Sequence, residues 1–196
     1  MNFETYLQTV KLRCRPLPPD KQLVHAQIGM VTELGELGDL LKRELAYGKE
    51  FDRINLMEEC GDYLWYFVLY CDERMIHPKV LDAIVAKCDG LPIGSDSDEA
   101  IFRMLVSAAS MLVAHVELDI SRQSELGMVE SSLMLVYGLL KKYDFTMAQC
   151  LVANDAKLEL RTGKAFSADR ILNRDTDAER KVLEEHGQAE PRQAAG

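Results

Sequence analysis

The feature that most constrains the fold is a long helical repeat of apolar residues in the first quarter of the chain. Between residues 20 and 46, apolar side chains recur at helical spacing, at Leu23, Met30, Leu34, Leu37, Leu41 and Leu45. This spacing gathers them into one stripe along an α-helix. Asp20 is suited to cap the start of such a helix, and Gly48 is suited to its end. The pattern predicts a long amphipathic helix whose stripe must be covered by other elements.

The remainder of the chain also favours helices. They are expected over residues 2–14, 53–74, 78–87, 98–121, 125–143 and 146–161. Residues 63–71 are apolar on nearly every face, which marks the 53–74 helix as central and buried. No stretch reads as a convincing strand, and only six prolines and twelve glycines interrupt the chain. We therefore expect an all-α fold, a four-helix-bundle arrangement with accessory helices.

The clearest linker is DGLPIGSDSD, residues 89–98, because it combines glycine, proline, serine and aspartate. It separates a helical half at 1–88 from a second helical half at 98–180, and we expect the two to pack as one domain. Residues 187–196 are polar and are expected to form a disordered tail.

A weak internal similarity links the two halves. MEECGDYLWYFVLYCDERM, starting at residue 57, resembles VESSLMLVYGLLKKYDFTM, starting at residue 129. This alignment places Glu130 opposite Glu58 and Tyr137 opposite Trp65. It fits either a degenerate duplication or a chance similarity between two apolar helices.

The composition of the chain argues against nucleic acid and membranes as partners. The net charge of −9 argues against nucleic acid, whose phosphates need a basic surface. Five cysteines without a C-x-x-C pair indicate reduced, mostly buried thiols. The N-terminus has no apolar core typical of a secretory signal, and no apolar run is long enough to span a membrane. We expect a soluble cytoplasmic protein with no membrane partner.

Two pairs of acidic residues stand on consecutive helices. Glu33 and Glu36 are three residues apart in TELGELGDL, and Glu59 and Asp62 repeat that spacing in MEECGDYLWY. Residues three apart lie on one side of a helix, one turn from each other. Either pair alone is typical of a solvated helix face. Two pairs on helices that pack antiparallel can instead meet in the interior of a bundle.

Four carboxylates in one interior would repel each other, by about 4 kcal/mol for each pair 4 Å apart at an effective dielectric near 20. Protonation or a bound divalent cation relieves this repulsion. Oxygen-only ligands suit Mg²⁺, with Mn²⁺ as a substitute, and such cations in turn bring nucleotide phosphates. A di-iron carboxylate site is excluded, because none of the four histidines follows a glutamate by three residues.

These residues carry a family resemblance. HAQIGMVTELGELGDLLKRELAYGKEFDRINLMEECGDYLWY, residues 25–66, resembles the MazG-like all-α nucleoside triphosphate pyrophosphohydrolases of phages and bacteria, whose signature is E-x-x-E followed by E-x-x-D. Residues 154–179 are similar to the basic ending of that group. Residues 75–150 match poorly, since relatives run almost directly from the second acidic motif to the basic segment. The extra helices could form within one chain what relatives form between subunits.

The resemblance implies Mg²⁺-dependent hydrolysis of a nucleoside or deoxynucleoside triphosphate to a monophosphate and pyrophosphate, in a homodimer or homotetramer. If a phage encodes the protein, the host cytoplasm is the expected location. It implies that the metal is held by Glu33, Glu36, Glu59 and Asp62. One of these glutamates, or Glu58, could deprotonate the attacking water. The same scaffold serves dUTP or dCTP diphosphatases and phosphoribosyl-ATP pyrophosphohydrolases, and a catalytically inactive assembly module is a further alternative.

Candidate substrate contacts lie outside the acidic motifs. Asn154, Lys157 and Arg161 share one helix face and could clamp phosphates, against the alternative of surface solubility. Lys164 and Lys49 could reach the same phosphates. Trp65 and Tyr66 could stack on the base, although aromatic residues in an apolar helix are more often core.

Overall fold

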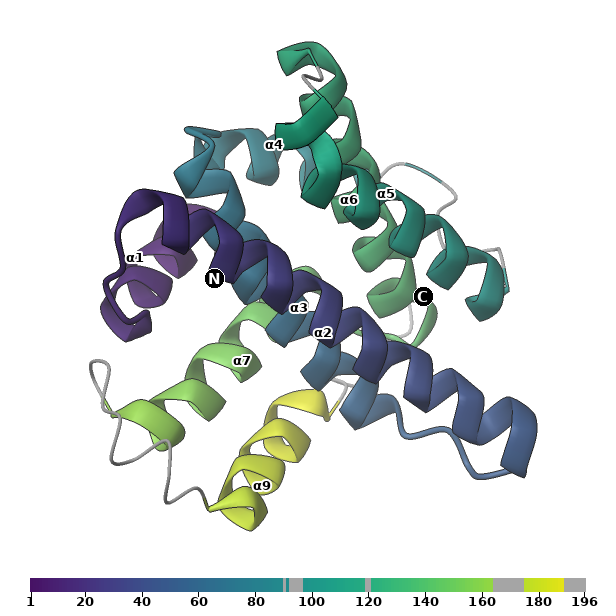
Figure 1. Ribbon diagram of the computed structural model, residues 1–196. Helices are drawn as coiled ribbons and strands as arrows, with labels where there is room; N and C mark the ends of the chain where they lie inside the picture. Colours follow the sequence, from purple (N-terminus) through teal and green to yellow (C-terminus); the bar gives the residue numbers. More distant parts are fainter. Residues whose placement is uncertain (90, 92–96, 119–120, 164–174, 189–196) are drawn as a thin grey trace, which may run out of the picture.

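The computed structural model describes residues 1–89, 91, 97–118, 121–163 and 175–188 of the chain, with the side chains of 115–118 omitted. These residues form eight helices and no strand (Figure 1), which confirms the all-α prediction. The helices are α1 (Phe3–Arg13), α2 (Pro19–Tyr47), α3 (Arg53–Glu73), α4 (Pro78–Cys88), α5 (Asp98–Leu118), α6 (Arg122–Lys142), α7 (Met147–Thr162) and α9 (Thr176–Gly187). Within the described residues, no helix is both long enough and apolar enough to cross a bilayer.

Local signals in the sequence set the ends of the two longest N-terminal helices. Gly48 ends α2 in the left-handed conformation, with φ of 61°, which costs glycine little because it has no Cβ. Asp52 caps α3 by accepting hydrogen bonds from the backbone N–H groups of Ile54 and Asn55. Asp20 was expected to cap α2, and this was wrong. The helix starts earlier, at Pro19, and Asp20 lies in its first turn, where a negative charge favours the helix dipole.

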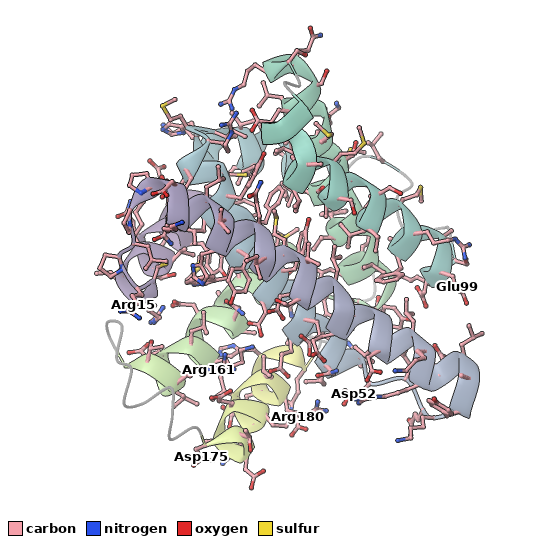
Figure 2. All side chains as sticks on the ribbon, in the orientation of Figure 1. Arg15, Asp52, Glu99, Arg161, Asp175 and Arg180 are labelled. Atoms are coloured by element: carbon pink, nitrogen blue, oxygen red, sulfur yellow. The ribbon has the colours of Figure 1, made fainter. Side chains whose placement is uncertain are left out.

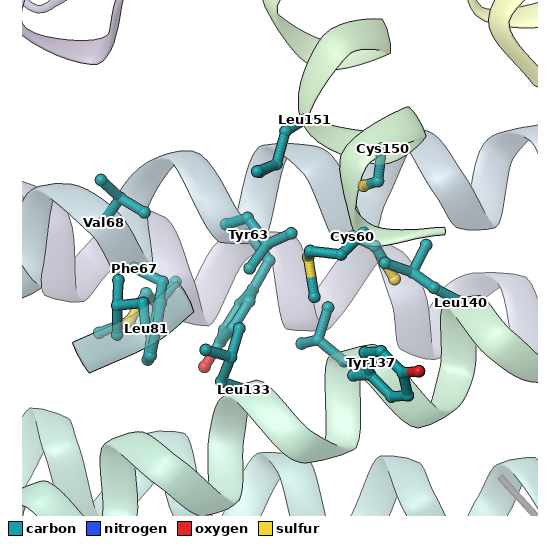
Figure 3. Close-up of a cluster of buried hydrophobic side chains, with 14 of the residues drawn as sticks. Cys60, Tyr63, Phe67, Val68, Leu81, Leu133, Tyr137, Leu140, Cys150 and Leu151 are labelled. Carbon is teal, nitrogen blue, oxygen red and sulfur yellow. The ribbon is translucent and has the colours of Figure 1, made fainter. Parts of the chain in front are cut away.

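The fold is built from two helical hairpins. Helix α3 packs along α2 and α6 packs along α5, and α2 lies beside α5 (Figure 1). The Gln27 side-chain amide ties these hairpins together by donating to the backbone oxygen of Val113 at 3.0 Å. The apolar side chains of α3 fill the space between α6 and α7, where Tyr63, Cys60 and Leu133 are all fully buried (Figure 3). Helix α3 is therefore the central element, as its apolar sequence predicted.

The two halves of the chain repeat one backbone pattern. Helices α3 and α6 each have 21 residues. After each helix a residue turns left-handed, Met75 with φ of 53° and Asp144 with φ of 62°. In each turn the next backbone N–H returns to the helix, from Ile76 to the oxygen of Cys71 at 2.8 Å and from Phe145 to that of Leu140 at 2.9 Å. The following helices exchange partners, because α4 packs on α6 and α7 packs on α3.

This repeat has a different register from the one expected from the sequence. The equivalent helices start at Arg53 and Arg122, whereas the alignment of Glu58 with Glu130 displaces one helix by three residues, almost a full turn. In the structural register Asp62 corresponds to Ser131. The backbone pattern is therefore shared by the two halves in a register that differs from that of the sequence similarity.

Helix α9 was not predicted from the sequence. Its buried residues are Glu179, Leu183 and Gly187, four positions apart, so two of the three positions facing the protein are not apolar and the helix shows no hydrophobic stripe. It packs on α7 and α3, and it continues beyond residue 180, where the second half was expected to end. Of the predicted disordered tail, residues 189–196 lie outside the described residues.

Gly61 allows a close approach of α3 and α7. A Cβ at this position would lie 2.9 Å from Cβ of Asn154. We expect Gly61→Ala to lower the free energy of unfolding by about 1–3 kcal/mol, because the helices would have to separate. Urea denaturation measures the change.

Gly127→Ala is the matched control. Gly127 also lies within a long helix, but no atom would contact its Cβ within 4 Å. The substitution should raise the free energy of unfolding by about 0.5–1 kcal/mol, since alanine favours the helix more than glycine does. Equal effects of the two substitutions would contradict close packing at Gly61.

Candidate functional site

Three of the four predicted acidic residues come together between α2 and α3. Glu33 extends from α2, and Glu59 and Asp62 extend from α3. One carboxylate oxygen of each lies within 4.8 Å of those of the other two. This acidic triad could hold a cation, because it offers three hard oxygen ligands at one point.

Glu36 lies outside the triad. It is exposed on α2, beside the exposed Gly35 and between the buried Leu34 and Leu37. Its position is about 60° further around the helix than that of Glu33, since residues three apart differ by that angle. In this arrangement the rotation takes the side chain toward solvent, so the two pairs predicted from the sequence do not meet symmetrically.

Burial and mutual repulsion raise the proton affinity of the triad. The pKa of Glu33 rises to about 7, mainly because the side chain is buried and also because Asp62 is near. The pKa of Glu59 rises to about 8 for the same two reasons, with Glu58 adding to the repulsion. Burial disfavours a charge without a partner, so the triad is an environment that a bound cation would stabilise.

Lys157 neutralises one side of the triad. Its side chain is fully buried, and its Nζ donates to Asp62 Oδ2 and, at 3.2 Å, to Glu58 Oε1. Burial acts to lower the pKa of Lys157, but the charges of Asp62 and Glu58 outweigh it and raise the pKa above its ordinary value. The sequence suggested Lys157 as a phosphate clamp; the structure places it against the acidic residues instead.

A chain of hydrogen bonds fixes the other oxygen of Asp62. The side-chain amide of Asn154 donates to Asp62 Oδ1 at 2.6 Å. The hydroxyl of Tyr6, which is fully buried on α1, donates to Asn154 Oδ1 at 2.6 Å. Asn154 was also a predicted phosphate ligand, and it too binds the acidic cluster. Asp62 is therefore the most tightly held member of the triad.

A cavity of about 490 Å³ opens beside the triad. Glu33 and Asp62 form its acidic side, and an aromatic side is formed by His25, Trp65 and Tyr66. These rings meet edge to face, with centroids 5.5 Å apart for His25 and Tyr66 and 4.9 Å apart for Trp65 and Tyr66. The volume lies in the range of roughly 300–1,000 Å³ that small-molecule sites occupy.

Arginines form the basic side of the same cavity. They are Arg13, the last residue of α1, Arg15 in the segment that follows it, and Arg161 on α7. Arg13 pairs with Asp155, and Arg161 pairs with Glu179 of α9. Figure 2 shows Arg15 and Arg161 extending from separate elements of the fold. The cavity thus joins acidic, aromatic and basic groups.

Two of the cavity arginines were not predicted from the sequence, and two lysines that were predicted to contact phosphate are not among the described residues that line the cavity. Arg13 and Arg15 stand in RCRPLPP, where no spacing signal connects them to a helix more than a hundred residues later. Lys49 is exposed in the loop after α2 and is not among the residues lining the cavity. Lys164 lies outside the described residues.

The buried ion pair of Lys157 provides a test of the site's electrostatics. Lys157→Ala should lower the free energy of unfolding by about 3–5 kcal/mol, because it leaves Asp62 and Glu58 without a counter-charge. Chemical denaturation in a chelating buffer measures the loss. Lys87→Ala is the matched control, since Lys87 pairs with Glu130 at 2.7 Å on the surface and should contribute less than about 1 kcal/mol. Similar losses for both variants would show that Lys157 is not a buried counter-ion.

The raised pKa of Glu59 predicts a pH dependence of stability. A carboxyl group whose pKa rises from 4.5 to about 8 on folding binds its proton more tightly in the folded chain. It therefore lowers the free energy of unfolding as pH rises from 4.5 toward 8, and no further above that value. Without divalent cations, Glu59→Gln should be more stable than wild type at pH 8, and the difference should shrink toward pH 5. Thermal unfolding measures this; parallel pH profiles for the two proteins would contradict it.

Comparison with known proteins gives no further guide to the site. No family model, no curated protein and no solved structure matches the chain. The chemistry of the described residues therefore carries the functional argument.

Proposed function

We propose that the protein hydrolyses a nucleoside or deoxynucleoside triphosphate to a monophosphate and pyrophosphate, in the manner of the MazG-like pyrophosphohydrolases that its acidic motifs resemble. One observation carries this proposal: the acidic triad lies beside a cavity that has aromatic residues on one side and arginines on another. A base, a chain of phosphates and a cation each have a chemically matched side there.

The acidic triad suits a divalent cation. Its donors are all carboxylate oxygens, which favour Mg²⁺ or Mn²⁺ over softer metals. Burial, and then the nearby charge of Asp62, raise the pKa values of Glu33 and Glu59 despite the positive charge of Lys157, which supports an additional cation at this place. When bound, Mg²⁺ would neutralise the triphosphate and polarise a water molecule. The resemblance adds Glu36 as a fourth ligand, which would require its exposed side chain to turn inward.

The protein's own groups would bind and orient the substrate. Arg161 is suited to the phosphates, because a guanidinium can donate two parallel hydrogen bonds. Trp65 and Tyr66 offer aromatic surface to the base. Glu58 lies next to Glu59 and interacts with Lys157, so it is our candidate to accept the proton of the attacking water.

A hydrolysis panel tests the proposal. With Mg²⁺, purified protein should release pyrophosphate and a monophosphate from at least one of the common NTPs and dNTPs. Inclusion of dUTP and dCTP distinguishes the diphosphatase alternatives on this scaffold. Activity should disappear with a chelator. A panel with no pyrophosphate release, and no stabilisation by Mg²⁺ with nucleotide, would instead favour an inactive assembly module.

Substitutions test the roles of the acidic residues. Glu59→Gln should lower kcat/KM by more than about 100-fold, since it removes a metal ligand, while circular dichroism remains helical. Glu130→Gln, an acid on α6 that pairs with Lys87, is the control and should keep normal activity. Glu36→Gln is predicted to abolish turnover if the side chain turns in as a fourth ligand. Near-normal activity of Glu59→Gln would refute the metal assignment.

A further inference from the structure

The ion pair between α7 and α9 connects the C-terminal helix to the cavity. We propose that Glu179 is a positioning residue: it holds the guanidinium of Arg161 at the cavity wall for phosphate binding and away from Asp62. This inference rests on the proposed function, because it assigns Arg161 to the phosphates. It adds a helix, α9, that none of the acidic motifs includes.

The geometry is that of a fixed, two-point contact. Arg161 Nε donates to Glu179 Oε1 at 3.2 Å, and Nη2 donates to Oε2 at 2.8 Å. Both side chains are largely covered, with 18% of the Arg161 side chain and 4% of that of Glu179 exposed. A guanidinium has five N–H groups in a rigid plane. The two-point contact therefore fixes the orientation of the plane and leaves three N–H groups beyond those bonded to Glu179.

Anchoring of α9 does not by itself require a buried carboxylate. Leu183 is buried against the core, and Gly187 lies close to Ile54 and Met57 of α3. Arg180 adds a pair with Asp52 at 2.9 Å. A buried ion pair is a weak source of stability, because its charges must lose their hydration. Orientation of Arg161 is the property that Glu179 supplies and these contacts do not.

Arg161 also feels the attraction of the acidic cluster. Burial acts to lower its pKa, and Glu179 and Asp62 together raise it above its ordinary value, with Glu58 contributing. Because Asp62 and Arg161 line the same cavity, Asp62 is a competing partner for the same guanidinium. If Arg161 paired with Asp62, it would occupy an oxygen ligand of the triad and add a second positive charge beside Lys157. Glu179 prevents this by binding one edge of the guanidinium.

The experiment measures phosphate binding without catalysis. Tripolyphosphate is titrated calorimetrically into wild type, Glu179→Gln and Glu184→Gln, in metal-free buffer. Glu184 lies on the same helix but is exposed and bonds Arg180, so Glu184→Gln is a matched control. Glu179→Gln should raise Kd by about 10-fold, because the guanidinium loses its charged partner. Glu184→Gln should stay within about two-fold, as expected for a surface pair.

Two further readouts separate positioning from a structural role. Affinity for Mn²⁺ alone should fall in Glu179→Gln, because the released Arg161 competes for Asp62. In an Arg161→Gln background, Glu179→Gln should change neither affinity, since the residue acts through the charge of Arg161. Glu179→Asp keeps the charge and should restore most of the tripolyphosphate affinity. It also keeps the test valid should Glu179→Gln fail to fold.

Several results would overturn the inference. Unchanged Kd values for Glu179→Gln, or equal losses in Glu179→Gln and Glu184→Gln, would reduce Glu179 to an anchor for α9. Tighter tripolyphosphate binding by Glu179→Gln would mean that the ion pair blocks the site. Absence of tripolyphosphate binding by wild type would also refute it. Failure of the proposed function is distinct: wild type would bind tripolyphosphate through Arg161 yet release pyrophosphate from no nucleotide.

Discussion

The buried contact of Lys157 with Asp62 and Glu58 is the interaction on which the site depends. It joins the last turns of α7 to the centre of α3. The two helices lie close together here because Gly61 has no side chain. Without it, the carboxylates of α3 would face one another with no opposing charge in an environment that already raises the pKa of Glu59 to about 8. The fold can therefore keep acidic residues in its interior only because a lysine from the other half of the chain reaches them.

The second half of the chain, which repeats the backbone pattern, is consistent with this dependence. In the structural register Cys88 of α4 corresponds to Lys157, and Ser131 of α6 corresponds to Asp62. The position equivalent to the lysine, in the first half, and the position equivalent to the acid, in the second half, are thus both uncharged, as expected if neither charge is tolerated in the interior alone. A cavity of about 560 Å³ between α5 and α6 is lined there by four methionines, Met104, Met111, Met128 and Met134, together with small and polar residues. Of the two equivalent places, only the one between α2 and α3 has the charged network among the described residues.

Most of the fold could be predicted from the sequence, and the site only in part. Helix periods, Gly48 and Pro78 located the elements, and the spacing of Glu33, Glu59 and Asp62 located the acidic triad. The roles of Asn154 and Lys157 could not be predicted, because a helix pattern shows that residues share a face but not what that face meets. Helix α9 could not be predicted, because a glutamate and a glycine occupy two of its three buried positions and interrupt the apolar stripe. Glu179 is buried in an ion pair with Arg161 of α7, and no pattern within α9 itself indicates this partner.

Lys157 and Arg161 stand four residues apart on one face of α7, yet they have different partners. If both paired with the acidic cluster, two positive charges would oppose the carboxylates and weaken the attraction for a cation. Glu179 pairs with Arg161, so the charge of Arg161 does not neutralise the acidic cluster, and the side chain still lines the cavity. Under the proposed function, the acidic triad would then keep a negative charge for a metal, and the arginine would keep a positive charge for an anion. Separation of the two charges by α9 would allow one small cavity to bind both a cation and an anion.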